Sequence, residues 1–380
     1  MPRATWFAIA TLSSVVYLLN SCGKSDSGAT GPKLAKKDAD AEVLNIYNWA
    51  DFIAPDTISS FEKETGIKVN VSYFDSNDTL ETRMLTGHSG FDIVFPSDTY
   101  FQREIRSGAY LALDKAQLPN LSHLDPALMA RATSYDPGSA HGIVYMWGTV
   151  GIGYNESRVA AALPNVPVNS WRLLFDPTLA KKLAPCGINV INEPAVVVGI
   201  ALKYLGKDPS APSPQDFVDV EKLLLSIRPF IRTFDTSGDI EAMVNGEICI
   251  SLGYSGDVVL ANNRAREAKK PIKVAYVIPA EGSMLWFTLT AIPRDAPHAA
   301  NAHMFLNYLM NPQVIANISN FIAYANPNAD AVPLLDAKIA TNTIIYPTRD
   351  EQKRLFVDTD YSPEQSRAIT RLWQKFKTGQ

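Results

Sequence analysis

The chain has 380 residues, 46% of them hydrophobic, with 35 Lys and Arg against 39 Asp and Glu. A sequence of this length and hydrophobic content can bury a large core, which excludes an intrinsically disordered protein. The formal net charge of -4 leaves no surplus of positive charge to attract phosphate backbones, so we expect no nucleic-acid partner.

Residues 1–22 have the composition of an export signal. An apolar run over residues 6–19 (WFAIATLSSVVYLL) is shorter than the ~20 residues of a membrane-spanning helix. The run ends in the sequence LNSCG, which resembles the bacterial lipobox and makes Cys22 a candidate for acylation and membrane anchoring. Cleavage near Ser21 without acylation is the alternative. Residues 23–42 lack apolar periodicity and are rich in small and charged residues, which predicts a flexible tether.

Strands and helices alternate in the next part of the sequence. The pattern predicts strands over residues 43–47, 69–74 and 91–95. Between them it predicts a helix over 56–65 and the beginning of another over 81–86. This alternation is typical of a parallel sheet with helices on both faces. In such sheets ligands bind beyond the carboxyl ends of the strands, so we expect the loops over 48–54 and 96–100 to contribute to a site.

A second set of strands and helices follows Gly151. Strands are predicted over residues 188–191 and 248–252, and helices over 195–205 and 216–226. The sequence therefore predicts an α/β fold with two α/β lobes and a ligand cleft between them.

Two cysteines remain after the export signal. Because an even number of cysteines in an exported chain favours pairing, we expect a disulfide between Cys186 and Cys249, with each cysteine beside a strand of the same lobe. Two buried free thiols are the alternative. The five histidines show no spacing typical of a zinc site, so no metal is expected.

No catalytic motif is complete in this sequence. Residues 253–257 (GYSGD) lack the closing Gly of a nucleophile elbow, and residues 148–153 (GTVGIG) have the wrong spacing for a dinucleotide-binding loop. We therefore expect a binding protein without a cofactor, and no enzymatic activity.

Four strings of residues resemble a known family. They are 44–55 (LNIYNWADFIAP), 61–69 (FEKETGIKV), 145–155 (YMWGTVGIGYN) and 204–209 (YLGKDP), and they are similar to the putrescine- and spermidine-binding proteins of bacterial ABC importers. The resemblance runs from about Leu44 to the C-terminus. It implies a type II periplasmic-binding-protein fold, with discontinuous lobes over 43–145 plus 268–337 and over 146–267 plus 338–380. The crossing strands would lie at 145–148 and near 265–274.

The chemistry of a polyamine determines what such a site needs. Removing an ammonium ion from water costs several kcal/mol unless it is paired with an acid, and an aromatic face returns roughly 0.5 to 2 kcal/mol. The positions that match the family's amine-binding residues are Trp49, Asp51, Ser97, Tyr254, Asp257, Trp286 and Tyr324. The resemblance implies that Asp257 pairs a terminal ammonium, that the four aromatic residues wall the methylenes, and that Asp51 and Ser97 close the cleft.

The sequence departs from the family at two acids. Putrescine-binding members carry a Glu shortly after the Pro that matches Pro194, and an Asp at the position of Thr288, whereas this chain has Ala195, Val196 and Thr288. Candidates for a relocated acid are Glu193, where spermidine-binding members tend to carry an acid, and Asp98; Tyr100 also resembles the spermidine-binding members. Two hypotheses follow: a polyamine bound with a relocated acid, or a ligand with a single ammonium such as an ω-amino acid. The polyamine is favoured because the matching positions contain no Arg for a ligand carboxylate.

The resemblance also implies a setting and partners. We expect an exported, periplasmic, monomeric protein, held at the membrane through Cys22 if that residue is acylated, which delivers a small-molecule polyamine to the permease of an ABC importer. The alternative is a receptor that presents its ligand to a sensor.

Overall fold

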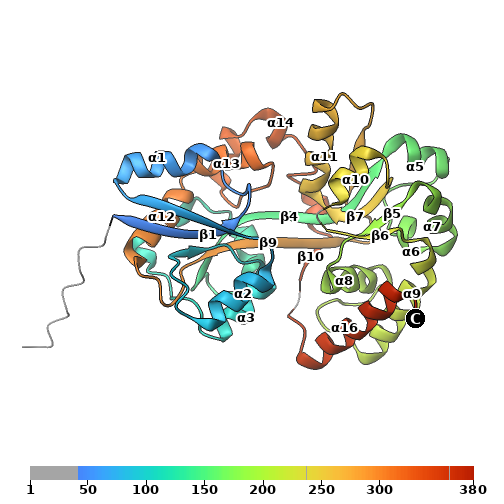
Figure 1. Cartoon of the computed structure of the whole chain (residues 1–380), viewed down its shortest axis with the longest axis horizontal. Helices are drawn as coiled ribbons and strands as arrows, with labels where there is room; N and C mark the ends of the chain where they lie inside the picture. Colours follow the sequence, from blue (N-terminus) through green and yellow to red (C-terminus); the bar gives the residue numbers. More distant parts are fainter. Residues whose placement is uncertain (1–41, 237, 359) are drawn as a thin grey trace, which may run out of the picture. The chain divides into compact units, whose positions relative to one another are not determined.

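The computed structural model describes residues 42–236, 238–358 and 360–380 (Figure 1). The predicted export signal, Cys22 and all but the last residue of the predicted tether lie outside these ranges. Within them, no helix combines the length and apolar character needed to cross a membrane.

Ten strands form one mixed sheet in the order β2, β1, β3, β9, β4, β7, β5, β6, with β10 paired to β9 and β8 paired to β4. The strands are β1 (Val43–Trp49), β2 (Lys68–Phe74), β3 (Ile93–Val94), β4 (Gly142–Asn155), β5 (Ile188–Val190), β6 (Thr233–Phe234), β7 (Ile250–Tyr254), β8 (Val274–Val277), β9 (Ser283–Ala291) and β10 (Leu355–Val357). The pairings of β1 with β2 and β3, and of β5 with β6 and β7, are parallel, as the alternation of strands and helices predicts.

The α-helices are α1 (Pro55–Thr65), α2 (Asn77–Thr86), α3 (Asp98–Arg106), α4 (Pro126–Ala132), α5 (Glu156–Ala162), α6 (Arg172–Phe175), α7 (Pro177–Leu183), α8 (Pro194–Tyr204), α9 (Pro214–Ile227), α10 (Asp239–Asn245), α11 (Ser255–Glu267), α12 (Ala299–Leu309), α13 (Pro312–Ile322), α14 (Ala337–Ala340), α15 (Arg349–Gln352) and α16 (Pro363–Thr378). Short 3-10 helices are η1 (Lys115–Gln117), η2 (Pro119–His123), η3 (Ala184–Cys186), η4 (Arg228–Phe230) and η5 (Ala329–Leu334).

Local sequence explains where these elements begin and end. Helix α1 begins at Pro55, which has no amide hydrogen to lose, and ends at Thr65, followed by Gly66, whose φ of 78° suits a residue without a side chain. Helix α2 begins four residues before the predicted 81–86 segment, because the Ser76 hydroxyl caps it by accepting from the Thr79 amide. In β1, alternate residues are buried, which fixes the register of its pairing with β2.

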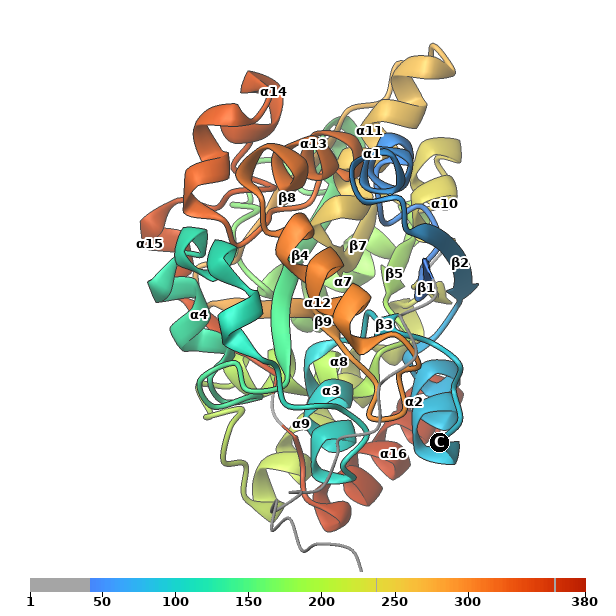
Figure 2. The same cartoon turned by 90° about the vertical axis from the view of Figure 1, so that its left-hand side faces the viewer.

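Helices cover both faces of the sheet. In the first part, α1 and α13 lie on one face and α2 and α3 on the other, and Figure 2 shows the same two layers from the side. In the second part, α10 and α11 lie on one face and α8, α9 and α16 on the other (Figure 1). The fold is therefore the mixed α/β architecture expected from the sequence.

Strand β4 runs through both parts of the sheet. Its first half, from Gly142 to Thr149, pairs with β9, and its second half, from Val150, pairs with β7 and β8. The second long strand is β9. The prediction that residues 265–274 form a crossing strand is wrong, because α11 ends there and a loop leads to β8.

Each part of the sheet carries its own hydrophobic core. The first core takes its buried residues from 44–147 and 278–345, together with Leu355. The second takes them from 150–252 and 361–376, together with Met284. A smaller cluster over 240–274 joins α10, α11 and β8. The second lobe was predicted to include residues 338–380, but Ile339 and Ile345 pack in the first core. The other predicted lobe boundaries stay predictions.

Cys186 and Cys249 form the expected disulfide, with their Cα atoms 5.5 Å apart. Cys186 precedes β5 and Cys249 precedes β7, and these strands are parallel neighbours. The bond therefore ties together two adjacent strands of the second part of the sheet.

Candidate functional site

The loop after β1 carries Trp49 and Asp51. The indole Nε1 of Trp49 donates to the Phe95 carbonyl at 2.9 Å, and its ring packs on Phe74 with 4.4 Å between centroids. Trp49 is therefore fixed beside the loop that follows β3. Asp51 is exposed with a positive φ of 56°, and no hydrogen bond within the described ranges joins its carboxylate to another predicted site residue.

Ser97 and Asp98 begin helix α3 and lie against β9. Ser97 forms an isolated bridge with Thr288, and its hydroxyl accepts from the Asn77 side chain at 3.0 Å. Both oxygens of the buried Asp98 accept from backbone amides: Oδ2 from Phe287 at 3.1 Å and Oδ1 from Thr99 at 2.9 Å. Burial raises the pKa of Asp98 to about 6, and these hydrogen bonds act in the opposite direction. Asp98 thus anchors the start of α3 to β9.

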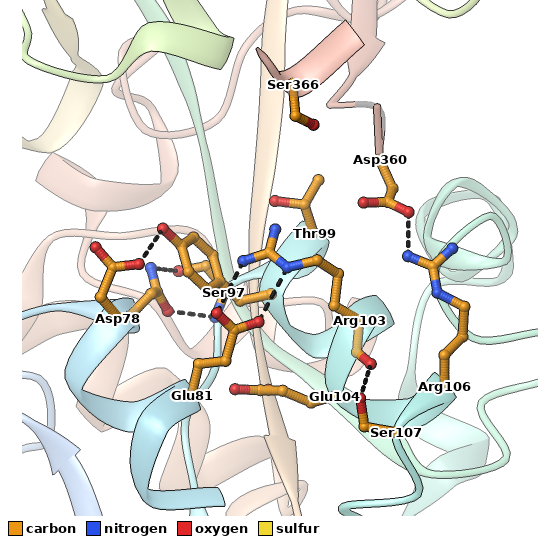
Figure 3. A network of polar contacts seen from close by, with 12 residues as sticks. Asp78, Glu81, Ser97, Thr99, Arg103, Glu104, Arg106, Ser107, Asp360 and Ser366 are labelled. Atoms are coloured by element: carbon orange, nitrogen blue, oxygen red, sulfur yellow. Dashed lines mark hydrogen bonds and ion pairs between the residues drawn. The ribbon is translucent and has the colours of Figure 1, made fainter. Parts of the chain in front are cut away.

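Tyr100 belongs to a polar network between α2 and α3. Its hydroxyl donates to Asp78 at 3.0 Å, and the Arg103 guanidinium lies over its ring, 4.2 Å from the centroid. Arg103 also donates to both oxygens of Glu81, at 2.9 and 3.3 Å (Figure 3). Arg103 is therefore already paired with an acid of α2.

Glu193 approaches the same region from the second part of the sheet. It is the residue before α8, and it is half-buried. Burial, followed by the negative charge of Asp78, raises the pKa of Glu193 to about 7. The charge of Glu193 in turn contributes to raising the pKa of the Tyr100 hydroxyl. Glu193 and the network of Tyr100 and Asp78 are therefore close enough to interact.

Aromatic side chains form a continuous row across the two parts of the sheet. The ring centroids of Tyr254 and Trp286 are 6.0 Å apart, and those of Trp286 and Tyr324 are 5.2 Å apart, both edge to face. Phe52, from the loop after β1, extends the row with a contact of 5.9 Å to Tyr324. Four distant segments of the chain thus meet in one row.

Two glycines allow the row to approach the backbone. A Cβ atom on Gly148 would lie 2.5 Å from the Trp286 ring, and one on Gly256 would lie 2.1 Å from the Tyr324 ring. A side chain at either position would have to displace an aromatic ring. The Trp286 indole nitrogen is buried and has no hydrogen-bond partner in the part of the chain that the structure describes.

Acidic residues surround Tyr254 at the end of this row. Burial is the largest cause that raises the pKa of the Tyr254 hydroxyl, and the negative charges of Glu193, Asp257 and Asp98 add to it. Three predicted site acids therefore converge on one tyrosine. Asp257 lies in the first turn of α11, and its Oδ2 is buried without a hydrogen-bond partner among the described residues.

Within the part of the chain that the structure describes, these acids have no cationic side chain paired with them. None of the ion pairs formed within residues 42–236, 238–358 and 360–380 includes Asp98, Glu193 or Asp257. Burial raises the pKa of Asp257 well above its ordinary value. A buried carboxylate without a partner is costly, and a bound cation would remove that cost. The arrangement suits an alkylammonium, with acids for the charge and aromatic faces for the chain.

The two departures from the family pattern lie next to these residues. Thr288 is two residues after Trp286 on β9, so the two side chains point to the same face of the strand. Ala195 lies in the first turn of α8, two residues after Glu193. The site therefore lacks acids at two places that border it.

Two acids in this region were missed from the sequence. Asp78 and Asp239 each stand in the first turn of a helix, α2 and α10, where an acidic residue is ordinary because it faces the positive end of the helix dipole. Nothing in the local sequence separated them from other helix-starting acids, because only the tertiary packing brings them toward the site. Among the described residues, no group of three or more His, Cys, Asp or Glu side chains could hold a metal ion.

Residues 56–347 match the family of bacterial extracellular solute-binding proteins. The chain is 44% identical over 342 residues to the putrescine-binding periplasmic protein SpuD of Pseudomonas aeruginosa, covering 90% of this chain and 93% of that protein. It is also 44% identical over 343 residues to the putrescine-binding periplasmic protein PotF of Escherichia coli, with the same coverage.

Solved structures agree with these sequence relatives. The spermidine/putrescine substrate-binding protein PotD of Streptococcus pneumoniae superposes with a TM-score of 0.79 at 26% identity, over 89% of this chain and 99% of that one. A putative spermidine/putrescine ABC transporter protein from Listeria monocytogenes gives 0.76 at 30% identity, over 90% of this chain and 100% of that one.

Proposed function

Because the chain belongs to the family of bacterial extracellular solute-binding proteins, we propose that it captures a polyamine, putrescine or spermidine, and delivers it to an ABC importer. The observation that carries this proposal is that Asp98, Glu193 and Asp257, whose charges all act on Tyr254, form no ion pair within the described residues and lie next to the row of aromatic rings. Binding, without a chemical step, is the activity that this arrangement supports.

Each residue of the candidate site has its own role in this proposal. Asp257 pairs a terminal ammonium of the ligand, and Tyr254, Trp286, Tyr324 and Trp49 line its methylene chain. Glu193 supplies negative charge toward the other end, near Asp78 and Tyr100. Asp51 and Ser97 close over the ligand from the first part of the sheet. Asp98 positions the start of α3 against β9, because its oxygens accept hydrogen bonds from backbone amides.

An ω-amino acid is the competing ligand, and two observations weigh against it. A ligand carboxylate would need a free Arg or a helix N-terminus. Arg103 is occupied by Glu81, and Arg106 by Asp360 (Figure 3). The start of α8 carries Glu193, whose charge opposes an anion there.

Relatives that are named as periplasmic support a proposal for the setting of the protein. We propose that this chain is exported as a monomer and that its lobes close on the ligand before contact with a membrane permease. Acylation of Cys22 would hold it at the membrane surface. A receptor that presents the same ligand to a sensor would use the same site.

Isothermal titration calorimetry of the chain from residue 41 tests the ligand. We expect binding of putrescine or spermidine, and no binding of 4-aminobutyrate or 5-aminovalerate. Asp257→Asn keeps the shape of the side chain and removes its charge, so it should weaken amine binding by well over tenfold. Asp56→Asn, which removes an exposed acid of α1, is the matched control and should bind as the unchanged protein does.

Each result has a defined meaning. Binding of the amino acids alone would replace the polyamine with a single-ammonium ligand. Unchanged affinity in Asp257→Asn would remove that residue from the site. A ligand that binds only the folded state also raises the free energy of unfolding by RT ln(1 + [L]/Kd). The resulting rise in melting temperature gives an independent check.

A further inference from the structure

A second buried acid lies close to Asp257. Asp239 begins α10 and is 3% exposed. Its Oδ2 accepts a hydrogen bond from the Ser251 hydroxyl at 3.1 Å, whereas its Oδ1 has no hydrogen-bond partner within the described chain. The Oδ2 of Asp257 likewise has no hydrogen-bond partner among the described residues. Two neighbouring carboxylates thus each hold one buried, unsatisfied oxygen.

Both carboxylates line the same internal cavity of about 10 Å³. A cavity of this size holds about one water molecule. Two glycines, Gly153 and Gly253, form part of its wall, and a Cβ atom on Gly253 would lie 3.1 Å from Asp239 Oδ2. The polar lining and the small volume suit a single bridging water.

The two acids interact with each other and with few other charges. After burial, the charge of Asp239 is the next cause that raises the pKa of Asp257. The other titratable groups that feel the charge of Asp257 are the hydroxyls of Tyr254, Tyr276 and Tyr324. Asp235 acts on Asp239 with a further negative charge. No ion pair in the described ranges includes Asp239 or Asp257, so no cationic side chain there is paired with either carboxyl group.

We propose, resting on the polyamine binding proposed above, that Asp239 is a second carboxylate of the ammonium site. Asp257 contacts a terminal primary ammonium of the ligand directly, and Asp239 adds its charge through a water molecule in the cavity that both residues line. The pair thereby supplies negative charge that Ala195 and Thr288 do not provide. Asp239 is a positioning residue in this scheme, and the ligand class is a primary alkylammonium.

The test compares two variants of α10 by titration with putrescine. Asp239→Asn should weaken binding at least tenfold. Glu241→Gln removes an exposed acid two residues along the same helix and should leave the dissociation constant within twofold. Without ligand, the melting temperature of Asp239→Asn should be unchanged or higher, because the substitution removes an uncompensated buried charge. Asp239→Ser serves as a second variant with a smaller polar side chain.

A pH profile separates this role from a structural one. Without the charge of Asp239, the pKa of Asp257 falls, so the acidic limb of putrescine affinity should move to lower pH in Asp239→Asn. A residue that only supports the fold would lower the melting temperature and leave this limb in place.

Unchanged affinity and an unchanged acidic limb in both Asp239 variants would overturn the inference and leave a structural water only in the cavity. Loss of binding in Asp257→Asn alone would keep the proposed function and reject Asp239. Absence of amine binding by the unchanged protein would reject the proposed function itself.

Discussion

Glu104 of α3 is a buried acid outside the candidate site. It is 0% exposed, and its Oε2 accepts from the Tyr110 hydroxyl at 2.6 Å, while its Oε1 has no hydrogen-bond partner in the described ranges. Burial raises the pKa of Glu104 from 4.5 to about 7. The folded state therefore binds more protons than the unfolded state between those pH values, and the free energy of unfolding falls as the pH rises through that window.

Removing this acid should stabilise the protein at alkaline pH. We expect Glu104→Gln, which can still accept from Tyr110, to raise the free energy of unfolding at pH 8 by on the order of 2 kcal/mol. At pH 4.5 the gain should vanish. Thermal unfolding at both values measures the difference, with Glu64→Gln on the exposed side of α1 as control. An equal effect at both pH values would contradict the buried-charge explanation.

Single residues also show what sequence can and cannot reveal about the site. Tyr254, Asp257 and Trp286 were found because they stand at positions that match amine-binding residues of the family that the sequence resembles. Asp98 was proposed as a ligand acid, but its oxygens accept from the backbone, one of them at Phe287, which is 189 positions away in the chain. Asp239 was missed, because its burial depends on packing between α10, α11 and β7. Long-range contacts of this kind leave no local pattern.

At the scale of elements, helix α11 holds Tyr324 in the aromatic row through Gly256. In Gly256→Ala the new methyl group would displace the Tyr324 ring and disturb its contact with Trp286. We expect amine affinity to fall at least tenfold. Gly199→Ala in α8 is the control, since its nearest neighbour would be at 3.4 Å, an ordinary contact. That variant should bind normally and gain up to ~1 kcal/mol of helix stability.

Titration calorimetry and thermal unfolding of the two variants measure these effects. Normal binding by Gly256→Ala would mean that Tyr324 can move without loss, and would remove it from the wall of the site.

The elements themselves were largely predictable. The predicted strand over 69–74 and helix over 216–226 match β2 and α9 within two residues. Apolar and polar residues alternate in the first part of β2, and α9 begins with a capping box at Ser213. The predicted crossing strand near 265–274 failed for a physical reason. The resemblance gives the order of the segments along the chain, but it does not say which strand pairs with the first half of β4. In the structure that partner is β9.

At the scale of the whole described chain, β4 and β9 join the two hydrophobic cores. Residues of β4 pack in both cores, and β9 contributes Leu285 and Phe287 to the first and Met284 to the second. Unfolding of either core would therefore disrupt strands that also pack in the other core. We therefore expect a single cooperative unfolding transition, with equal calorimetric and van't Hoff enthalpies.

Differential scanning calorimetry of the double variant Cys186→Ser, Cys249→Ser makes this test sharp. The disulfide lies in the second part of the sheet alone, and its loss should cost about 2 to 4 kcal/mol. If the cores are coupled, one transition moves to lower temperature. A separate early transition for the second core would show that they unfold independently.

The interleaving of the two cores has a consequence for synthesis. The first core takes its residues from 44–147 and 278–345. Its N-terminal strands are therefore synthesised long before the segments on which they pack. The second core is completed only by 361–376, in α16. Because a ribosome delivers the N-terminus first, neither core can close until nearly all of the chain has emerged. Such a delay in folding would suit the export that we propose for this chain.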